Sequence, residues 1–266
     1  MKKWLTLLFY GLVLMFAVSG GEVCAAEISD AGYQRITYQG SDYEYNSQIK
    51  VIMFAGIDSE GELTTYNRYS VAPRTDTIDL LILDDYHKKM KLLTISRDTI
   101  TTIDRYAMNG ERRNSYDTQI GYAFSYGDGG KASCENLVNA VSRLLGGVPI
   151  HEYVVTNTSS LPFSNNGRME RQGEYIREYL KKFREMILED PEQAWNQMET
   201  MRDSMLTSIT KNQYLKLADL MGGENLSDAD CYYLEGKNVQ EGIHDAFYPE
   251  EEKLYDMIVE LFYLER

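Results

Sequence analysis

Charged residues whose types suit phosphate and metal binding are concentrated between positions 58 and 98 of this chain. Asp58 follows an apolar run, residues 74–77 read Arg-Thr-Asp-Thr, and residues 96–99 read Ser-Arg-Asp-Thr. Two carboxylates brought together repel, so one takes up a proton or both share a cation. Mg²⁺ suits such a pair, because it binds one or two carboxylates together with phosphate oxygens. We therefore predict that Asp58 and Asp76 hold Mg²⁺.

Arginines in the same region predict the ligand that the metal would share. Arg74 and Arg97 can each donate paired hydrogen bonds to phosphate oxygens, which arginine does better than lysine. The candidate catalytic residues are Asp58, Asp76 and Arg97, and the candidate substrate contacts are Arg74 and Arg97. Spacing alone allows a second interpretation equally well, in which these side chains form buried structural ion pairs at strand ends.

A second pair of arginines follows much later in the chain. Arg168 and Arg171 lie three residues apart, on one face of a predicted helix. Backbone amides at the start of a helix add positive potential, so both are candidate phosphate contacts. The alternative is a solvated helix end in which they pair with Glu170 and Glu174.

Three predicted strands must position the first group of residues. Ile49–Ile57 is a nearly continuous apolar run, as expected of a strand buried on both faces. Thr77–Leu83 and Lys91–Ser96 are two further strands, and the short polar turn at 84–89 between them favours an antiparallel hairpin. If the middle strand is antiparallel to both neighbours, all three charged clusters meet at one edge, where α/β sheets usually bind ligands.

The remaining pattern alternates helical and extended segments, which indicates an α/β fold: a three-layer α-β-α domain with a central mixed β-sheet. Apolar residues at three- and four-residue spacing predict the helices. The predicted helices are Ser133–Leu145, Arg168–Leu188, Pro191–Thr207 and Glu250–Leu264, and the further strands are Glu152–Thr156 and one near Asp230–Leu234.

The first residues predict export from the cytoplasm. Residues 1–26 combine two lysines, an uncharged apolar run and the small residues Cys24-Ala25-Ala26 before Glu27. A cleaved signal peptide and a retained membrane anchor both stay open, although the run is short for a spanning helix, and a lipoprotein at Cys24 fits less well. We predict a linker over 27–49 and one domain over 50–266.

Charge and residue spacing exclude several classes of function. The formal net charge of −14 makes nucleic acid an unsuitable partner, so phosphate binding needs a local positive pocket or a metal. His87, His151 and His244 lack zinc-ligand spacing among themselves or with cysteines, and no serine has a plausible histidine partner for a catalytic triad. Cys134 and Cys231 are predicted to be buried and unpaired.

Several sequence elements, taken in order, resemble the LytR-CpsA-Psr family. They are VIMFAGIDSEG, RTDTIDLLILDDYHKKMKLLTISRDT, QIGYAFSYGDGG and LLGGVPIHEYVV, with the later RMERQ fitting as well. The family pattern is a Gly-[Ile/Val]-Asp strand end, Arg-[Ser/Thr]-Asp-Thr, [Ser/Pro]-Arg-Asp-Thr and a later Arg-x-x-Arg-Gln. The resemblance covers roughly Lys50 to Val155.

The resemblance implies an extracytoplasmic, Mg²⁺-dependent phosphotransferase. Such an enzyme moves glycopolymers such as teichoic acid or capsule from a polyprenyl pyrophosphate carrier, held in an apolar pocket, onto peptidoglycan at the outer face of the cytoplasmic membrane. It would make Asp58 and Asp76 the metal and catalytic carboxylates and Arg74 and Arg97 the pyrophosphate contacts. Arg168 and Arg171 match the late arginine motif.

The chain departs from the family pattern in one segment. Between Val155 and Arg168 it is shorter than family members, which usually carry a Gly-Gly-Val element and a Tyr-x-Arg-x-Arg segment there. We therefore expect one wall of the usual pocket and at least one arginine to be missing. A non-catalytic binder of lipid-linked pyrophosphate and a polyprenyl-pyrophosphate pyrophosphatase are the alternative functions.

Overall fold

The computed structural model describes residues 27–28, 34–59, 63–157, 181–182, 184–200, 202–222, 231–241 and 244–266. The chain divides into two compact units: one holds the residues up to Ser47 and Tyr263–Arg266, and the other holds Gln48–Phe262. The predicted leader and the arginines Arg168 and Arg171 lie outside the described residues.

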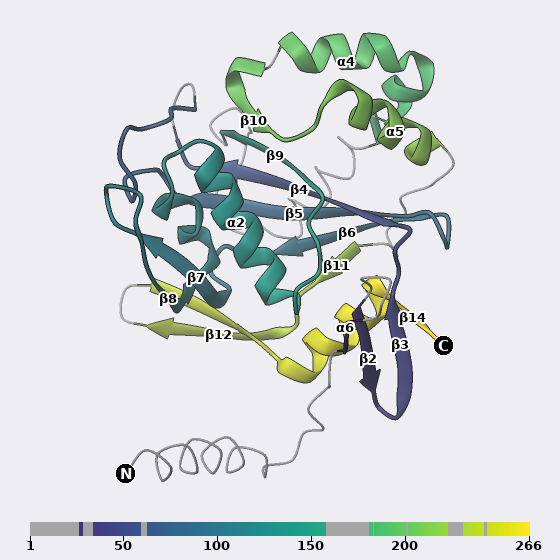
Figure 1. Ribbon diagram of the computed structural model, residues 1–266, viewed down its shortest axis with the longest axis horizontal. Helices are drawn as coiled ribbons and strands as arrows, with labels where there is room; N and C mark the ends of the chain where they lie inside the picture. Colours follow the sequence, from purple (N-terminus) through teal and green to yellow (C-terminus); the bar gives the residue numbers. More distant parts are fainter. Residues whose placement is uncertain are drawn as a thin grey trace, which may run out of the picture. The chain divides into compact units, whose positions relative to one another are not determined.

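A six-stranded mixed sheet is the centre of the larger unit (Figure 1), with the order β10-β9-β4-β5-β6-β11. Strand β5 is antiparallel to β4 and to β6, whereas β9 is parallel to β4 and β11 is parallel to β6. The predicted mixed sheet is thereby confirmed. Its strands are β4 (Ile49–Ile57), β5 (Thr75–Asp84), β6 (Lys89–Ile95), β9 (Glu152–Asn157), β10 (Met205–Thr207) and β11 (Cys231–Tyr233).

The central strands are apolar because both faces of the sheet are covered. Ile52 and Leu81 on one face, and Met53 and Leu80 on the other, are each at most 3% exposed. An alternating pattern would leave one face polar, so the continuous apolar runs of β4 and β5 correspond to burial on both sides.

Helices cover the two faces. On one face, α4 (Pro191–Thr200) and α5 (Lys211–Gly222) bring Trp195 and Tyr214 into a core with Ile52 of β4. On the other face lies α2 (Lys131–Leu144), whose Cys134 and Leu137 are fully buried. The predicted three-layer α-β-α architecture is confirmed.

Two hairpins, several short turns and helix α6 complete the larger unit. Asp104 on β7 is buried and accepts hydrogen bonds from Arg112 of β8 and Arg143 of α2, both at 2.7 Å, so it joins the first hairpin to the helix. The elements are β7 (Ile100–Tyr106), β8 (Arg112–Gln119), η1 (Ile120–Tyr122), η2 (Phe124–Tyr126), η4 (Arg202–Ser204), β12 (Gly236–Glu241), β13 (His244–Pro249) and α6 (Glu251–Phe262).

Two sequence predictions are wrong. Residues 27–49 were expected to be a linker, but the described residues there include β1 (Glu27–Ile28), β2 (Gln34–Tyr38) and β3 (Ser41–Tyr45), which with β14 (Tyr263–Glu265) form the sheet of the smaller unit. The helix predicted over Pro191–Thr207 ends at Thr200, because Met205–Thr207 pairs with β9 as strand β10.

Two other expectations can be compared with the described residues. Neither Cys134 nor Cys231 forms a disulfide within the described residues, as predicted, but only Cys134 is fully buried, since Cys231 is partly exposed. Within the described residues, no helix has the length and apolar character needed to span a membrane.

Candidate functional site at the strand ends

The ends of β4, β5 and β6 that carry the predicted site residues lie side by side at one end of the sheet, which we call the strand-end edge. Because β5 is antiparallel to both neighbours, Asp58 after β4, Arg74 before β5 and Arg97 after β6 share this edge. The backbone N–H of Asp58 donates a 2.9 Å hydrogen bond to the carbonyl oxygen of Arg74. The shared edge predicted from the strand pattern is confirmed, and the chemical roles of the residues stay predictions.

Asp76 occupies an irregular position in β5. Gly56 pairs with Thr77 and Ile57 pairs with Thr75, so Asp76 is the additional residue of a β-bulge. A bulge redirects a side chain relative to the regular alternation of the strand. Asp76 is 8% exposed and accepts a hydrogen bond from the guanidinium of Arg97, whose side chain is 34% exposed. The ion pair is therefore open to solvent on its arginine side.

Arg74 is held in place by two neighbours. Its Nη2 donates a 2.8 Å hydrogen bond to Oε1 of Gln119, and its guanidinium carbon lies 3.9 Å above the ring centre of Tyr122. The stacked ring stabilises the cation. Nε2 of Gln119 donates to Oδ1 of Asp98 at 3.0 Å and to the carbonyl oxygen of Asp245. Gln119 thus fixes the position of Arg74 relative to β6 and β13.

Gly121 allows the turn η1 to pack directly on the strand ends. Its N–H donates to the carbonyl oxygen of Arg97 at 2.9 Å, and a Cβ at this position would lie 2.9 Å from the carbonyl oxygen of Thr75. A side chain would push the turn away from both strands. The close packing of η1 on the strand ends places Gln119 and Tyr122 beside Arg74. One signal for these residues was present in the sequence, since QIGYAF belongs to the elements that resemble the family.

Buried polar atoms without hydrogen-bond partners in the described residues gather near this edge. They include Oγ of Ser59, Nε of Arg74, Oγ1 of Thr75 and Oγ1 of Thr99. Each such atom costs about 1–3 kcal/mol when it stays unpaired, so a concentration of them indicates a place for a polar ligand or water.

The carboxylates at the edge fit one class of metal. The described residues contain no group of three or more His, Cys, Asp and Glu side chains that could hold an ion by themselves. Asp58 is exposed and Asp76 is nearly buried at the same edge. Two carboxylate donors fit Mg²⁺, which takes its other ligands from water and phosphate, and do not fit a structural zinc site.

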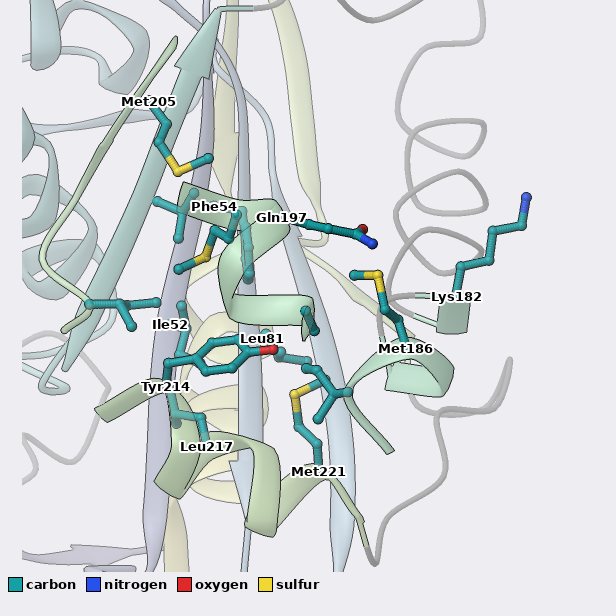
Figure 2. Close-up of a pocket in the computed structure, with 15 residues that line it drawn as sticks. Ile52, Phe54, Leu81, Lys182, Met186, Gln197, Met205, Tyr214, Leu217 and Met221 are labelled. Atoms are coloured by element: carbon teal, nitrogen blue, oxygen red, sulfur yellow. The ribbon is translucent and has the colours of Figure 1, made fainter. Parts of the chain in front are cut away.

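An apolar pocket of about 340 Å³ lies between the sheet and the helices α4 and α5. Figure 2 shows Ile52, Phe54 and Leu81 of the sheet facing Tyr214 and Leu217 of α5, with methionines around them. The described residues therefore form an apolar pocket despite the short segment after Val155. Its lining residues are Ile52, Phe54, Leu81, Val154, Lys182, Met186, Ile187, Ala194, Gln197, Met198, Met205, Ile209, Tyr214, Leu217 and Met221.

An ionisable group lies in the same sheet between the pocket and the charged edge. Asp79 pairs with Phe54 of β4 and is 1% exposed. Burial raises the pKa of Asp79 to about 7, although a 2.6 Å hydrogen bond from Oγ1 of Thr94 favours its charged form. The sequence did not single out this residue, because it stands alone within an apolar strand.

Comparisons with known proteins give both a family and a fold. The LytR_cpsA_psr family profile matches residues 24–163. Three solved structures are similar over 80% of this chain: yvhJ of Bacillus subtilis, described as a transcriptional regulator (20% identity, TM-score 0.58, 95% of that chain), TagV of B. subtilis (19%, 0.56, 96%), and a transcriptional regulator of Enterococcus faecalis (16%, 0.57, 86%). At these identities the structures establish a shared fold. No curated protein sequence matches the chain significantly.

Proposed function

This chain belongs to the LytR-CpsA-Psr family, and from that premise we propose that it transfers an anionic glycopolymer, such as teichoic acid or capsule, from a polyprenyl pyrophosphate carrier to peptidoglycan. The observation that supports this most directly is the strand-end edge. There Arg74 and Arg97 lie with two carboxylates and several unpartnered buried polar atoms, which is a suitable environment for a pyrophosphate.

The apolar pocket supports a lipid carrier. Strand β4 runs from the pocket residue Phe54 to the charged edge at Asp58, a distance of about 13 Å at roughly 3.3 Å per residue. An isoprenoid chain in the pocket could therefore be joined to a pyrophosphate at the edge. The lining is almost entirely apolar, and Lys182 extends away from the apolar side chains in Figure 2.

In the proposed reaction, a hydroxyl oxygen of the acceptor sugar attacks the phosphorus that carries the glycopolymer. The new oxygen–phosphorus bond forms as the bond to the bridging pyrophosphate oxygen breaks, and polyprenyl phosphate leaves with that electron pair. The hydroxyl proton passes to a carboxylate, for which Asp76 is the candidate. Arg74 and Arg97 bind the outer phosphate oxygens and stabilise the charge that develops on the leaving group.

Asp58 and Asp76 are the residues that would hold Mg²⁺. When bound, the ion adds stabilisation of the same negative charge. We place the protein outside the cytoplasm, at the outer face of the membrane, with residues 1–26 as a cleaved leader or a retained anchor.

A reaction with the purified chain tests this function. It contains a polyprenyl pyrophosphate glycan, Mg²⁺ and peptidoglycan fragments, and the products are separated by mass. Glycan joined to peptidoglycan supports transfer, and Asp76→Ala should abolish it. Glycan phosphate released to water, with no joined product, would instead indicate a pyrophosphatase, and binding without turnover a non-catalytic carrier protein.

A further inference from the structure

A second hollow lies beside the strand-end site. It has a volume of about 530 Å³, within the range of about 300–1,000 Å³ that is typical of small-ligand sites. It shares no lining residue with the apolar pocket. Its walls come from the start of β7, the end of β8, the turns η1 and η2, and strand β13. We call it the tyrosine hollow.

Tyrosine rings form much of its wall. The ring centres of Tyr116 and Tyr126 are 6.2 Å apart and those of Tyr122 and Tyr126 are 6.4 Å apart. The hydroxyls of Tyr116 and Tyr126 are hydrogen-bonded to each other. Tyr248 of β13 contributes a fourth ring, which is 40% exposed. Tyrosine offers an apolar ring that packs on the C–H face of a sugar and a hydroxyl that forms hydrogen bonds.

The charged residues that line the hollow are acidic. Asp117, Asp245 and Gln119 are among its lining residues, and Oδ1 of Asp117 accepts a 2.6 Å hydrogen bond from Oγ1 of Thr102. None of the described residues that line it is a lysine or an arginine. The carboxylates repel an anion, whereas they accept hydrogen bonds from the hydroxyl, amide or ammonium groups of a sugar.

The hollow and the strand-end site share two residues. Gln119 accepts the hydrogen bond from Nη2 of Arg74, and Tyr122 is the ring beneath the same guanidinium. Both side chains also line the hollow. A ligand in the hollow would therefore lie directly beside a cation that we assign to phosphate binding.

We infer that the tyrosine hollow binds an uncharged or amino-bearing saccharide and holds it with a hydroxyl toward the strand-end site. That this sugar is the acceptor of the glycopolymer rests on the proposed function, whereas the binding of a saccharide does not.

Two tetrasaccharides of similar size test the inference. Chitotetraose is uncharged, and hyaluronan tetrasaccharide carries carboxylates on alternate sugars. Each is titrated calorimetrically into the full-length chain, alone and with geranylgeranyl pyrophosphate and Mg²⁺ present. We expect chitotetraose to bind at least tenfold more tightly than the hyaluronan fragment. Equal binding of both, or binding of neither under both conditions, would overturn the inference.

Variants locate the binding site. Tyr248→Ala should weaken chitotetraose binding about tenfold, while Tyr86→Ala, which removes a 55% exposed tyrosine from the turn between β5 and β6, should leave it unchanged. Asp245→Asn should keep the fold and reduce the preference for the uncharged sugar. Unchanged binding in both Tyr248→Ala and Asp245→Asn would place the sugar elsewhere and contradict the inference.

The same titrations separate this inference from the proposed function. Geranylgeranyl pyrophosphate alone reports on the strand-end site, and its affinity should not change in Tyr248→Ala. If the saccharide binds and is lost in this variant while the pyrophosphate does not bind, the proposed function fails and the saccharide site stands. If the pyrophosphate binds and the saccharide does not, the inference fails and the proposed function stands.

Discussion

The guanidinium of Arg97, which follows β6, donates a hydrogen bond to the carboxylate of Asp76 at the β-bulge of β5. The arginine side chain is 34% exposed, whereas the aspartate is nearly buried. The aspartate thus fixes one end of the guanidinium, and Nε lies 3.8 Å from Oδ1 of Asp98, while the exposed third of the side chain is open to bind an anion. The charge and the donors are present before any substrate arrives, which is the condition for electrostatic stabilisation of a transition state.

Arg97→Ala should lower kcat for glycopolymer transfer about 100-fold or more, because it removes donors to the phosphate oxygens. Arg97→Lys should recover only part of the loss, since lysine keeps the charge but not the paired geometry. Arg113→Ala, which removes an exposed arginine on β8, is the matched control in the transfer assay. A wild-type rate in Arg97→Ala would remove this residue from the site.

Gly121→Ala should reduce activity through geometry alone. The added Cβ would meet the carbonyl oxygen of Thr75 at 2.9 Å, so η1 must move and carry Gln119 and Tyr122 away from Arg74. We expect at least a tenfold loss of kcat/KM. Gly147→Ala is the control, because its Cβ meets nothing within 4 Å but its φ of +93° makes alanine unfavourable. It should lower thermal stability without changing the rate per folded molecule.

Asp79 should make the folded protein less stable as the pH rises, which is the opposite of the effect of a carboxylate whose pKa is lowered by folding. Its pKa rises from 3.8 in the unfolded chain to about 7 in the folded protein, so the folded state binds more protons between these values. This contribution to stability is present below about pH 4 and is lost as the pH rises through about 7.

Asp79→Asn mimics the protonated form and can still accept the hydrogen bond from Thr94. It should raise the free energy of unfolding at pH 8 by about 2–4 kcal/mol and have little effect at pH 4. Urea unfolding at both pH values measures the difference. Asp85→Asn, the same substitution at a partly exposed position, is measured alongside as the control. An Asp79→Asn effect equal at both pH values would contradict the assignment.

The apolar pocket should bind the lipid part of the carrier. Leu217→Gln places an amide on the pocket wall and should weaken geranylgeranyl pyrophosphate binding about three- to tenfold, with little effect on inorganic pyrophosphate. Leu188→Gln changes a 52% exposed leucine outside the pocket and serves as the control. Equal losses for the two ligands in Leu217→Gln would mean that the pocket does not hold the lipid.

The central sheet and its charged edge could be predicted because their signals are local. The apolar runs of β4, β5 and β6 identify buried strands, and the short polar turn at 84–89 makes the β5–β6 hairpin antiparallel, which brings Arg74 and Arg97 to one edge. The antiparallel pairing of β4 with β5 adds Asp58 to the same edge. Helix α2 was found for a similar reason, since its buried residues recur at helical spacing.

Other elements could not be predicted because tertiary contacts create them. Most of strand β8 is exposed and polar, so it carries no apolar signal and forms by pairing with β7. Met205–Thr207 continues a helical pattern in sequence, yet pairing with β9 makes it a strand. The position of Gln119 depends on the packing of Gly121 against two strand ends, which no spacing rule contains.

A crystal structure of the chain with geranylgeranyl pyrophosphate and Mg²⁺ tests the central claim most directly. We predict that the phosphates contact the guanidinium groups of Arg74 and Arg97, that the metal lies between the phosphates and the carboxylates of Asp58 and Asp76, and that the isoprenoid enters the pocket beside Phe54. A pyrophosphate bound away from the strand-end edge, with the ion pair of Arg97 and Asp76 untouched, would contradict the account.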